Sequence, residues 1–517
     1  MREPTLSVVQ RRLFLNSATM MACRLASIAA ALIAIPIILK TLGMTAYGVW
    51  EAIFAFSTLS AVFQTPMSGT LIWLISRSFG ENDLAEIRRL VRIGIGGAML
   101  LAALVVPIVW WMSSSIIRLF HIPFPFFQTA KEMLPVLVAL SLLGGMNECF
   151  GAALSGCQRA GVTALMQTMG QFANNSIVIA MLLLTGSFWS LAAGAFVGFA
   201  ITAAGLYFFA CRICGTFSIV PLLPRQADLK AWWRYAGFLL VGSASTVLRG
   251  QTDRLILASF ASPIWTGYYG IASRMAGAIM EASNLFYVPT IAAAGALHAR
   301  LDWQGIRQLF LKISAVVCLV AGMAILIIGG LYDRLEVLWL GKVIPETAPI
   351  LYLLLLGNSF AVILTGPGTA ICKGIGQAGI ETVYVASGLI LNLVLTITLV
   401  AWIGAMGTVV ASAVSWTVTC LLFVFILHRV LDLPLKATLS SGWSLICLIL
   451  TVVGLRIFAP ALPLAASRME ALWSICRLAP IISAVYFLGL LTFRMLPLPK
   501  SFGIPLEDRF PKAETVA

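Results

Sequence analysis

The stretch LVRIGIGGAMLLAALVVPIVWWM, which runs from Leu90 to Met112, decides the fold of this chain, and Arg92 is its only charged residue. At 1.5 Å per residue, a helix of this length crosses a hydrocarbon core about 30 Å thick. Hydrophobic residues make up 60% of the 517 residues and charged residues 10%, a balance that no water-soluble domain of this size shows. The sequence therefore predicts an all-α polytopic membrane protein.

Apolar stretches of this kind recur along the whole chain. We predict about fourteen transmembrane helices, at residues 14–38, 49–75, 90–112, 132–155, 163–185, 188–210, 235–260, 268–296, 309–331, 347–371, 381–403, 405–427, 438–458 and 471–493. Arg11 and Arg12 lead into a first segment that is too long for a cleaved signal peptide.

Basic residues are distributed unevenly between the predicted connections. If the N-terminus is cytoplasmic, 22 of the 34 Lys and Arg residues fall on the cytoplasmic side, 8 on the outer side and 4 inside the spans. The positive-inside rule then predicts that both termini are cytoplasmic. Anionic lipid of the inner leaflet accounts for the formal net charge of +14, so no nucleic-acid partner is expected.

The chain also contains an internal repeat. Pairs of identical residues recur at an offset of 219 or 218 positions, in equivalent connections or spans: Gly48 and Gly267, Asp83 and Asp302, Gly156 and Gly374, Asn174 and Asn392. Each repeat holds six spans, an even number, so both enter the membrane from the same side as a parallel repeat. We predict two six-helix lobes that face each other across a central cleft.

No connection is long enough to hold a soluble domain. We predict an N-terminal six-helix lobe at 1–212, a cytoplasmic linker at 213–234, a C-terminal six-helix lobe at 235–430, two extra transmembrane helices at 431–495 and a cytoplasmic tail at 496–517. Any activity of this chain is therefore expected within the membrane.

Four arginines lie inside predicted spans: Arg24, Arg249, Arg254 and Arg274. A charge at that depth costs at least a few kcal/mol unless it faces a bundle interior or a water-filled cavity. Because a guanidinium fork binds phosphate oxygens in pairs and stays ionised, these residues predict an anionic cargo. Arg24 has no acid on its own helix, and its equivalent in the repeat is the neutral Ser243.

Three acids within the spans offer another explanation for this positive charge. Asp253 follows Arg249 by four residues, the spacing of an ion pair on a helix. Glu281 shares a face with Arg274, and Glu148 lies in the fourth span. These acids are expected to be ion-pair partners, and Glu281 is also a candidate for proton coupling because burial favours its protonated form.

A polar seam runs along the fifth span, where Gln167, Gln171 and Asn174 recur at helical spacing. Such amides suit sugar hydroxyls, but hydrogen bonding between helices is their commoner use in membrane bundles. The matching Asn392 in the second repeat favours the structural interpretation. No Walker motif is present, and neither the Gly374 turn nor Cys211-x-x-Cys214 completes a cofactor or metal site, so no cofactor and no metal is expected.

Several stretches in order resemble the polysaccharide flippases of the multidrug/oligosaccharidyl-lipid/polysaccharide exporter superfamily. They are LGMTAYGVW at 42–50, the turn at Asp83, DRLIL at 253–257, GYYGIA at 267–272, and Gly374 before the Asn392 helix. The resemblance covers about residues 10–430. It implies two lobes with alternating access that move an undecaprenyl-pyrophosphate-linked oligosaccharide across the bacterial inner membrane, for O-antigen, capsule or exopolysaccharide.

In related lipid II flippases, arginines of the central cavity engage the pyrophosphate, and the resemblance assigns this role to Arg24 and Arg274. It also implies that the two last helices form a lipid groove, and that a polysaccharide polymerase and a chain-length regulator are partners alongside membrane lipids. Two alternatives remain open: a cation-coupled multidrug exporter of the same superfamily, and a polytopic glycan polymerase or ligase. An enzyme is not expected, because the outer loops are short.

Overall fold

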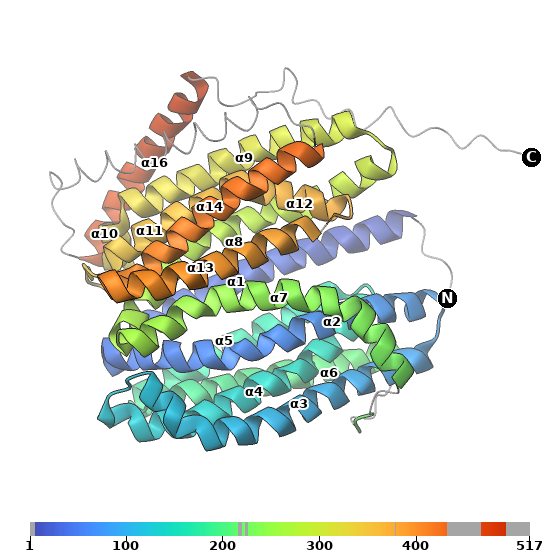
Figure 1. Ribbon diagram of the computed structural model, residues 1–517, viewed down its shortest axis with the longest axis horizontal. Helices are drawn as coiled ribbons and strands as arrows, with labels where there is room; N and C mark the ends of the chain where they lie inside the picture. Colours follow the sequence, from blue (N-terminus) through green and yellow to red (C-terminus); the bar gives the residue numbers. More distant parts are fainter. Residues whose placement is uncertain (1–5, 216–219, 223–225, 378, 432–466, 493–517) are drawn as a thin grey trace, which may run out of the picture.

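A computed structural model describes residues 6–215, 220–222, 226–377, 379–431 and 467–492. Within these ranges the chain forms helices and no strands (Figure 1). The α-helices are α1 Leu6–Ser57, α2 Ala61–Gly80, α3 Leu84–Leu119, α4 Phe124–Gly156, α5 Ala160–Thr185, α6 Ser190–Cys214, α7 Gln226–Phe260, α8 Pro263–Ala299, α9 Trp303–Gly330, α10 Tyr332–Leu340, α11 Thr347–Ser359, α12 Gly366–Gly374, α13 Gly379–Ile403, α14 Ala405–Leu431 and α16 Arg468–Thr492.

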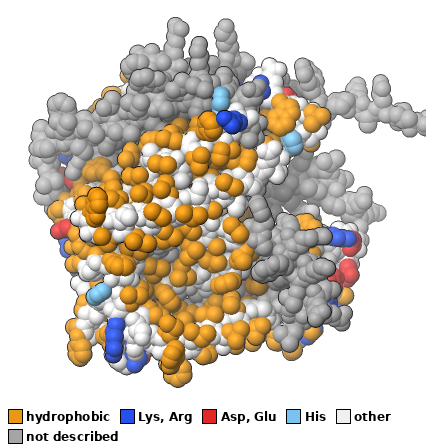
Figure 2. Space-filling view, in the orientation of Figure 1, with side chains coloured by type: hydrophobic (Ala, Val, Ile, Leu, Met, Phe, Trp, Pro, Cys, Tyr) orange, Lys and Arg blue, Asp and Glu red, His pale blue; other side chains and the backbone are white. Residues whose placement is uncertain are grey.

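The prediction of an all-α polytopic membrane protein is confirmed. Ten helical segments of the described residues are long and apolar enough to cross a membrane. They do not include α7 and α8, the two helices that carry most of the predicted intramembrane charges. The predicted span at 438–458 lies outside the described residues, and each of the others falls on helix. Figure 2 shows a broad hydrophobic face with charged side chains towards its edges.

Two of the predicted spans deviate from a regular helix. In α1 the backbone breaks at Gly43, whose φ of 84° favours glycine, and the second predicted span then continues through a 3₁₀ turn at Thr58–Ser60 into α2. The tenth predicted span consists of α11, a π-helical turn at Phe360–Thr365, and α12. The Tyr287 hydroxyl of α8 donates to the carbonyl of Val362 in that turn, at 2.9 Å.

The helices pack as two groups. Helices α1 to α6, which we call the first helix group, pack mainly against one another, and so do α7 to α14, the second helix group. The principal contacts between the groups join α1 to α8 and α2 to α7 (Figure 1). Helix α16 packs on α9 and α10, where the Tyr486 hydroxyl donates to the carbonyl of Cys318 at 3.0 Å.

Residues related by the internal repeat make equivalent contacts in the two groups. Gly156 packs on Ile75, and its counterpart Gly374 packs on Ala294, which lies 219 positions after Ile75. In both places an added Cβ would lie 2.6 Å from the facing side chain, so only glycine allows this approach. The common contact agrees with a duplicated six-helix unit.

The repeated pair Gly48 and Gly267 meets where α1 crosses α8. A Cβ on Gly48 would lie 1.7 Å from the Pro263 carbonyl oxygen, and one on Gly267 would lie 3.4 Å from the Cα of Gly48. Equivalent positions of the two repeats therefore touch each other at the contact between the groups. This close approach of backbones brings the side chains that follow Gly48 on α1 against the first turns of α8.

Candidate functional site

A buried carboxylate joins the two helix groups. Glu51 of α1, which is 1% exposed, pairs with Arg274 of α8 (Nη2 to Oε1, 2.7 Å) and with Arg254 of α7 (Nε to Oε2, 3.4 Å). Arg274 Nε also donates to the Tyr47 hydroxyl of α1 at 3.2 Å. We call these four residues, Glu51, Tyr47, Arg254 and Arg274, the Glu51 cluster.

The repeat supplies the space that Glu51 occupies. The position equivalent to Glu51 in the second repeat is Gly270, and a Cβ there would lie 3.0 Å from the Cγ of Glu51. A glycine on α8 thus lets the glutamate of α1 fit between the groups. Glu51 and Gly270 therefore occupy equivalent positions of the two repeats and contact each other, and Glu51 is the charged member of this pair.

Arg254 is hydrogen-bonded both to its own helix, α7, and to the following helix, α8. Its Nη1 donates to Gln251 of α7 and its Nη2 to Ser273 of α8, each at 3.1 Å. With one glutamate and two arginines, the Glu51 cluster carries one net positive charge. A buried ion pair contributes little net stability, because the cost of desolvating the charges offsets most of their attraction. Removing one partner is strongly destabilising, because the other charge is then buried without a counter-charge.

The sequence did not single out Glu51. It lies at the third residue of a predicted span, and its basic partners are more than 200 positions away, so no helical spacing relates them. The predicted partner of Arg274 was Glu281, which is half-buried on α8. Glu148 of α4 is also half-buried and has Ser68 of α2 as its hydrogen-bond partner.

Asp253 belongs to a second polar cluster, inside the second helix group. It is 3% exposed, and its Oδ2 accepts from the Tyr269 hydroxyl at 2.8 Å and from Ser412 Oγ at 2.5 Å. Asn392 donates to the same Ser412 at 2.7 Å. Asn392 is thus bonded between helices, as the structural interpretation of the polar seam expects.

The predicted ion pair between Arg249 and Asp253 is not formed. Arg249 is 8% exposed and lies over the Trp416 ring, with Cζ 3.6 Å from the ring centroid. Within the described ranges, Asp253 Oδ1 and the three guanidinium nitrogens of Arg249 have no hydrogen-bond partner. The spacing alone misled here, because Tyr269 and Ser412 hold the carboxylate instead.

The remaining predicted residues lie on α1 and α5. Arg24 is in the first part of α1, and its side chain is outside the described residues. Near it, Thr168 of α5 donates to the carbonyl of Cys23 at 3.4 Å. Gln167 and Gln171 of α5 are exposed, whereas Asn174 is half-buried and packs against Gly194 and Gly198 of α6, so the predicted seam divides into an exposed and a packed part.

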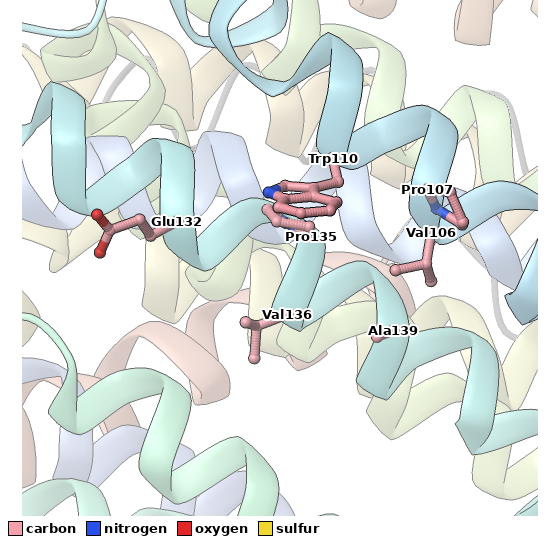
Figure 3. A pocket seen from close by; sticks show the side chains of 7 residues that line it. All are labelled: Val106, Pro107, Trp110, Glu132, Pro135, Val136 and Ala139. Carbon is pink, nitrogen blue, oxygen red and sulfur yellow. The ribbon is translucent and has the colours of Figure 1, made fainter.

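An apolar pocket of about 400 Å³ lies elsewhere, between α3 and α4 (Figure 3). Six of its seven lining residues are apolar, and the seventh is Glu132. None of the predicted site residues lines this pocket. In the part of the chain that the structure describes, no group of three or more His, Cys, Asp or Glu side chains is placed to hold a metal ion.

Comparison with known proteins gives a family match for part of the chain and a fold match for nearly all of it. The MatE family model matches residues 18–179, and no curated protein sequence matches the chain. A structure of the lipid II flippase MurJ, in an inward closed conformation, is 14% identical and has a TM-score of 0.71. The match covers 93% of this chain and 99% of that one.

Two MATE transporter structures also match. One is an inward-facing multidrug resistance MATE family transporter of the MOP superfamily, with 14% identity, a TM-score of 0.61, and coverage of 80% of this chain and 94% of that one. The other is the Vibrio cholerae MATE transporter VcmN, with 15% identity, a TM-score of 0.57, and coverage of 82% and 98%. The chain therefore has a MatE region at residues 18–179, together with the fold of the multidrug/oligosaccharidyl-lipid/polysaccharide exporter superfamily that the sequence resemblance predicted.

Proposed function

We propose that this protein is a flippase that moves undecaprenyl-pyrophosphate-linked oligosaccharide from the inner to the outer leaflet of a bacterial inner membrane. The observation that carries the proposal is the Glu51 cluster, in which two arginines of one helix group meet a single carboxylate of the other. The lipid II flippase with the same fold moves a lipid-linked cargo, which supports the same substrate class here.

The Glu51 cluster suits alternating access because its charges are divided between moving parts. Glu51 and Tyr47 travel with α1, whereas Arg254 and Arg274 travel with α7 and α8. When the groups separate at this contact, both guanidinium groups lose their carboxylate. Pyrophosphate oxygens can then take the place of the carboxylate beside the two guanidinium groups, so neither arginine is left without an anionic partner.

From the Glu51 cluster, we expect the cargo path to continue along the first helix group, past Arg24 and the exposed amides of α5. Exposed Gln167 and Gln171 are unsuited to lipid, and we expect them to face water or the sugar hydroxyls of the cargo. Arg24 occupies the α1 segment that contacts this part of α5, through Cys23 and Thr168. The phosphate groups of the cargo would thus contact arginines, and its sugar groups would contact the amides of α5.

The step that couples transport to an ion gradient is proposed at Asp253. Its carboxylate is buried, is held through one oxygen, and leaves Oδ1 without a hydrogen-bond partner among the described residues. Such a group can take up and release a cation or a proton within the second helix group. Glu281, half-buried on α8, is the second candidate for this step.

Export of small cationic drugs is the second candidate function. The MatE match at 18–179 and the buried acid Glu51 favour it, because a cationic cargo needs a carboxylate. The net positive charge of the Glu51 cluster favours the flippase. Resistance to cationic dyes on overexpression, without any effect on surface glycan, would support the drug exporter.

The experiment is complementation of surface glycan in a bacterium that lacks its own flippase for the matching glycan. Arg274→Ala and Arg24→Ala are expected to abolish surface glycan while the protein stays in the membrane, and Arg274→Lys is expected to restore part of it, because the positive charge remains. Arg77→Ala is the control, because Arg77 is exposed in the last turn of α2 and its ion-pair partner among the described residues is Glu81, four positions further along.

Wild-type glycan levels in both alanine variants at equal membrane abundance would contradict the proposed role of the arginines. We expect both termini on the cytoplasmic side, and a polysaccharide polymerase and a chain-length regulator as the partners that use the translocated unit.

A further inference from the structure

Arg249 is a buried cation that makes no side-chain hydrogen bond within the part of the chain that the structure describes. Its side chain is 8% exposed, and its Nε, Nη1 and Nη2 have no hydrogen-bond partner among the described residues. A guanidinium group has five N–H donors, and leaving buried donors unsatisfied costs free energy, more so for a charged group. A partner that is not part of the chain would remove this cost.

The guanidinium group is nevertheless held in a defined place. One face lies on the Trp416 ring of α14, with Cζ 3.6 Å from the centroid, a distance typical of a cation–π contact. On α13 its neighbour is Gly388, where a Cβ would lie only 2.2 Å from Nη1. An aromatic ring and a glycine thus position the cation between three helices of the second helix group. We call Arg249, Trp416 and Gly388 the Arg249 site.

The buried acids Asp253 and Glu51 form no ion pair with Arg249. Asp253, one turn further along α7, is bonded to Tyr269 and Ser412, and no ion pair joins it to Arg249. Glu51 is engaged by Arg254 and Arg274 at the contact with α1. Asp253 thus attracts the guanidinium group without bonding to it, and the N–H donors of Arg249 keep no partner among the described residues.

The internal repeat shows that packing of this fold does not require the Arg249 site. Offsets of 219 and 218 relate Arg249 to Ala30 and Trp416 to Gly198. In the first helix group, Gly198 lets α6 pack directly on α5, where an added Cβ would lie 2.8 Å from the Gly170 carbonyl oxygen. The second repeat places a large cation and a large ring at positions where the first repeat has small residues.

We propose that the Arg249 site binds a small inorganic anion of the chloride class. A small anion suits this site better than a phosphate that carries a lipid, because Trp416 covers one face of the guanidinium group, Gly388 packs against Nη1 and the side chain is only 8% exposed. The anion accepts hydrogen bonds from the guanidinium edge and neutralises the charge. This site is separate from the arginines that face α1, and it does not depend on the proposed flippase function.

The test is the thermal stability of the full-length protein in lipid nanodiscs, with chloride or gluconate at matched ionic strength. A ligand that binds only the folded state raises its stability, and chloride is expected to raise the unfolding midpoint of the wild type by about 1–3 °C. Arg249→Gln is expected to abolish the difference between the two anions. In crystals grown with bromide, an anomalous peak is expected beside the guanidinium group.

Gly388→Ala provides a second variant in case Arg249→Gln fails to fold. Its added methyl group displaces the flexible end of Arg249 and keeps the charge, so the chloride effect is expected to be lost or at least halved. Gly250→Ala is the matched control, because nothing lies within 4 Å of its Cβ, and it is expected to keep the full effect. Equal wild-type stability in chloride and gluconate, or an undiminished chloride effect in Arg249→Gln or Gly388→Ala, would overturn the proposal.

Discussion

Glu51 and Arg249 show which properties of single residues in this chain could be predicted from the sequence and which could not. Each intramembrane arginine was found by its charge in an apolar run, because charge and hydropathy are local properties. Their partners were not found, because Arg274 and Arg254 pair with a glutamate of another repeat. For Arg249 the local spacing indicated Asp253, but two hydroxyl groups from other helices hold that carboxylate.

Glu336 gives a prediction for pH dependence. It is fully buried in α10, outside the membrane-spanning helices, and it accepts hydrogen bonds from the backbone N–H of Ile344 and from the Thr347 hydroxyl. Burial raises the pKa of Glu336 from 4.5 to about 7. Between these two values the folded state binds more protons than the unfolded state, so the contribution is present below about pH 4.5 and is lost as the pH rises to about 7.

We therefore expect the unfolding midpoint of the wild type to fall by about 2–5 °C between pH 5 and pH 8. Glu336→Gln is expected to remove most of this dependence, and thermal unfolding in nanodiscs measures it. Glu81→Gln serves as a control, because the Glu81 side chain is 61% exposed. If Glu336→Gln keeps the wild-type pH profile, the buried carboxyl is not its source.

At the scale of helices, hydropathy located the spans, whereas the π-helical turn of the tenth span is held by a tertiary contact. The predicted spans at 14–38 and 49–75 lie on either side of the non-helical Gly43 in α1, and the second continues through the 3₁₀ turn at Thr58–Ser60 into α2. The π-helical turn at Phe360–Thr365 is bonded to Tyr287 of α8. A contact from a distant helix leaves no periodic signal in the local sequence, so this turn was not predicted.

The crossing of α1 and α8 gives a prediction at this scale. Gly48→Ala would place a Cβ 1.7 Å from the backbone carbonyl oxygen of Pro263, which cannot move aside as a flexible side chain does. We expect the helices to be forced apart at a cost of about 1–3 kcal/mol, with weaker pairing of Glu51 and Arg274. Thermal unfolding and surface glycan are both expected to decrease.

Gly277→Ala is the matched control on α8, because nothing lies within 4 Å of its added Cβ. It is expected to keep wild-type stability, or to gain slightly from the higher helix propensity of alanine. Equal unfolding midpoints for Gly48→Ala and Gly277→Ala would show that the close approach of α1 and α8 does not limit stability.

For the whole molecule, the sequence was informative about architecture because the repeat is recorded in it. The offset of 219 related Gly48 to Gly267, and the structure places these two glycines in contact between the helix groups. The charge distribution across this contact was not predictable, because the repeat has diverged there: Glu51 corresponds to Gly270, and Arg249 to Ala30. The asymmetry of the charges, rather than the shared fold, is what we expect to set the cargo.

Transport by purified protein in vesicles tests the central claim most directly. Undecaprenyl-pyrophosphate-linked oligosaccharide would be reconstituted with the wild type, with Arg274→Ala and with the exposed control Arg77→Ala, and the fraction of glycan reaching the opposite leaflet would be followed. We expect the wild type and the control to translocate the glycan, and Arg274→Ala to be at least about tenfold slower, a loss of about 1.4 kcal/mol or more in transition-state stabilisation. Translocation by Arg274→Ala at the wild-type rate, or by the wild type at the rate of empty vesicles, would contradict the account.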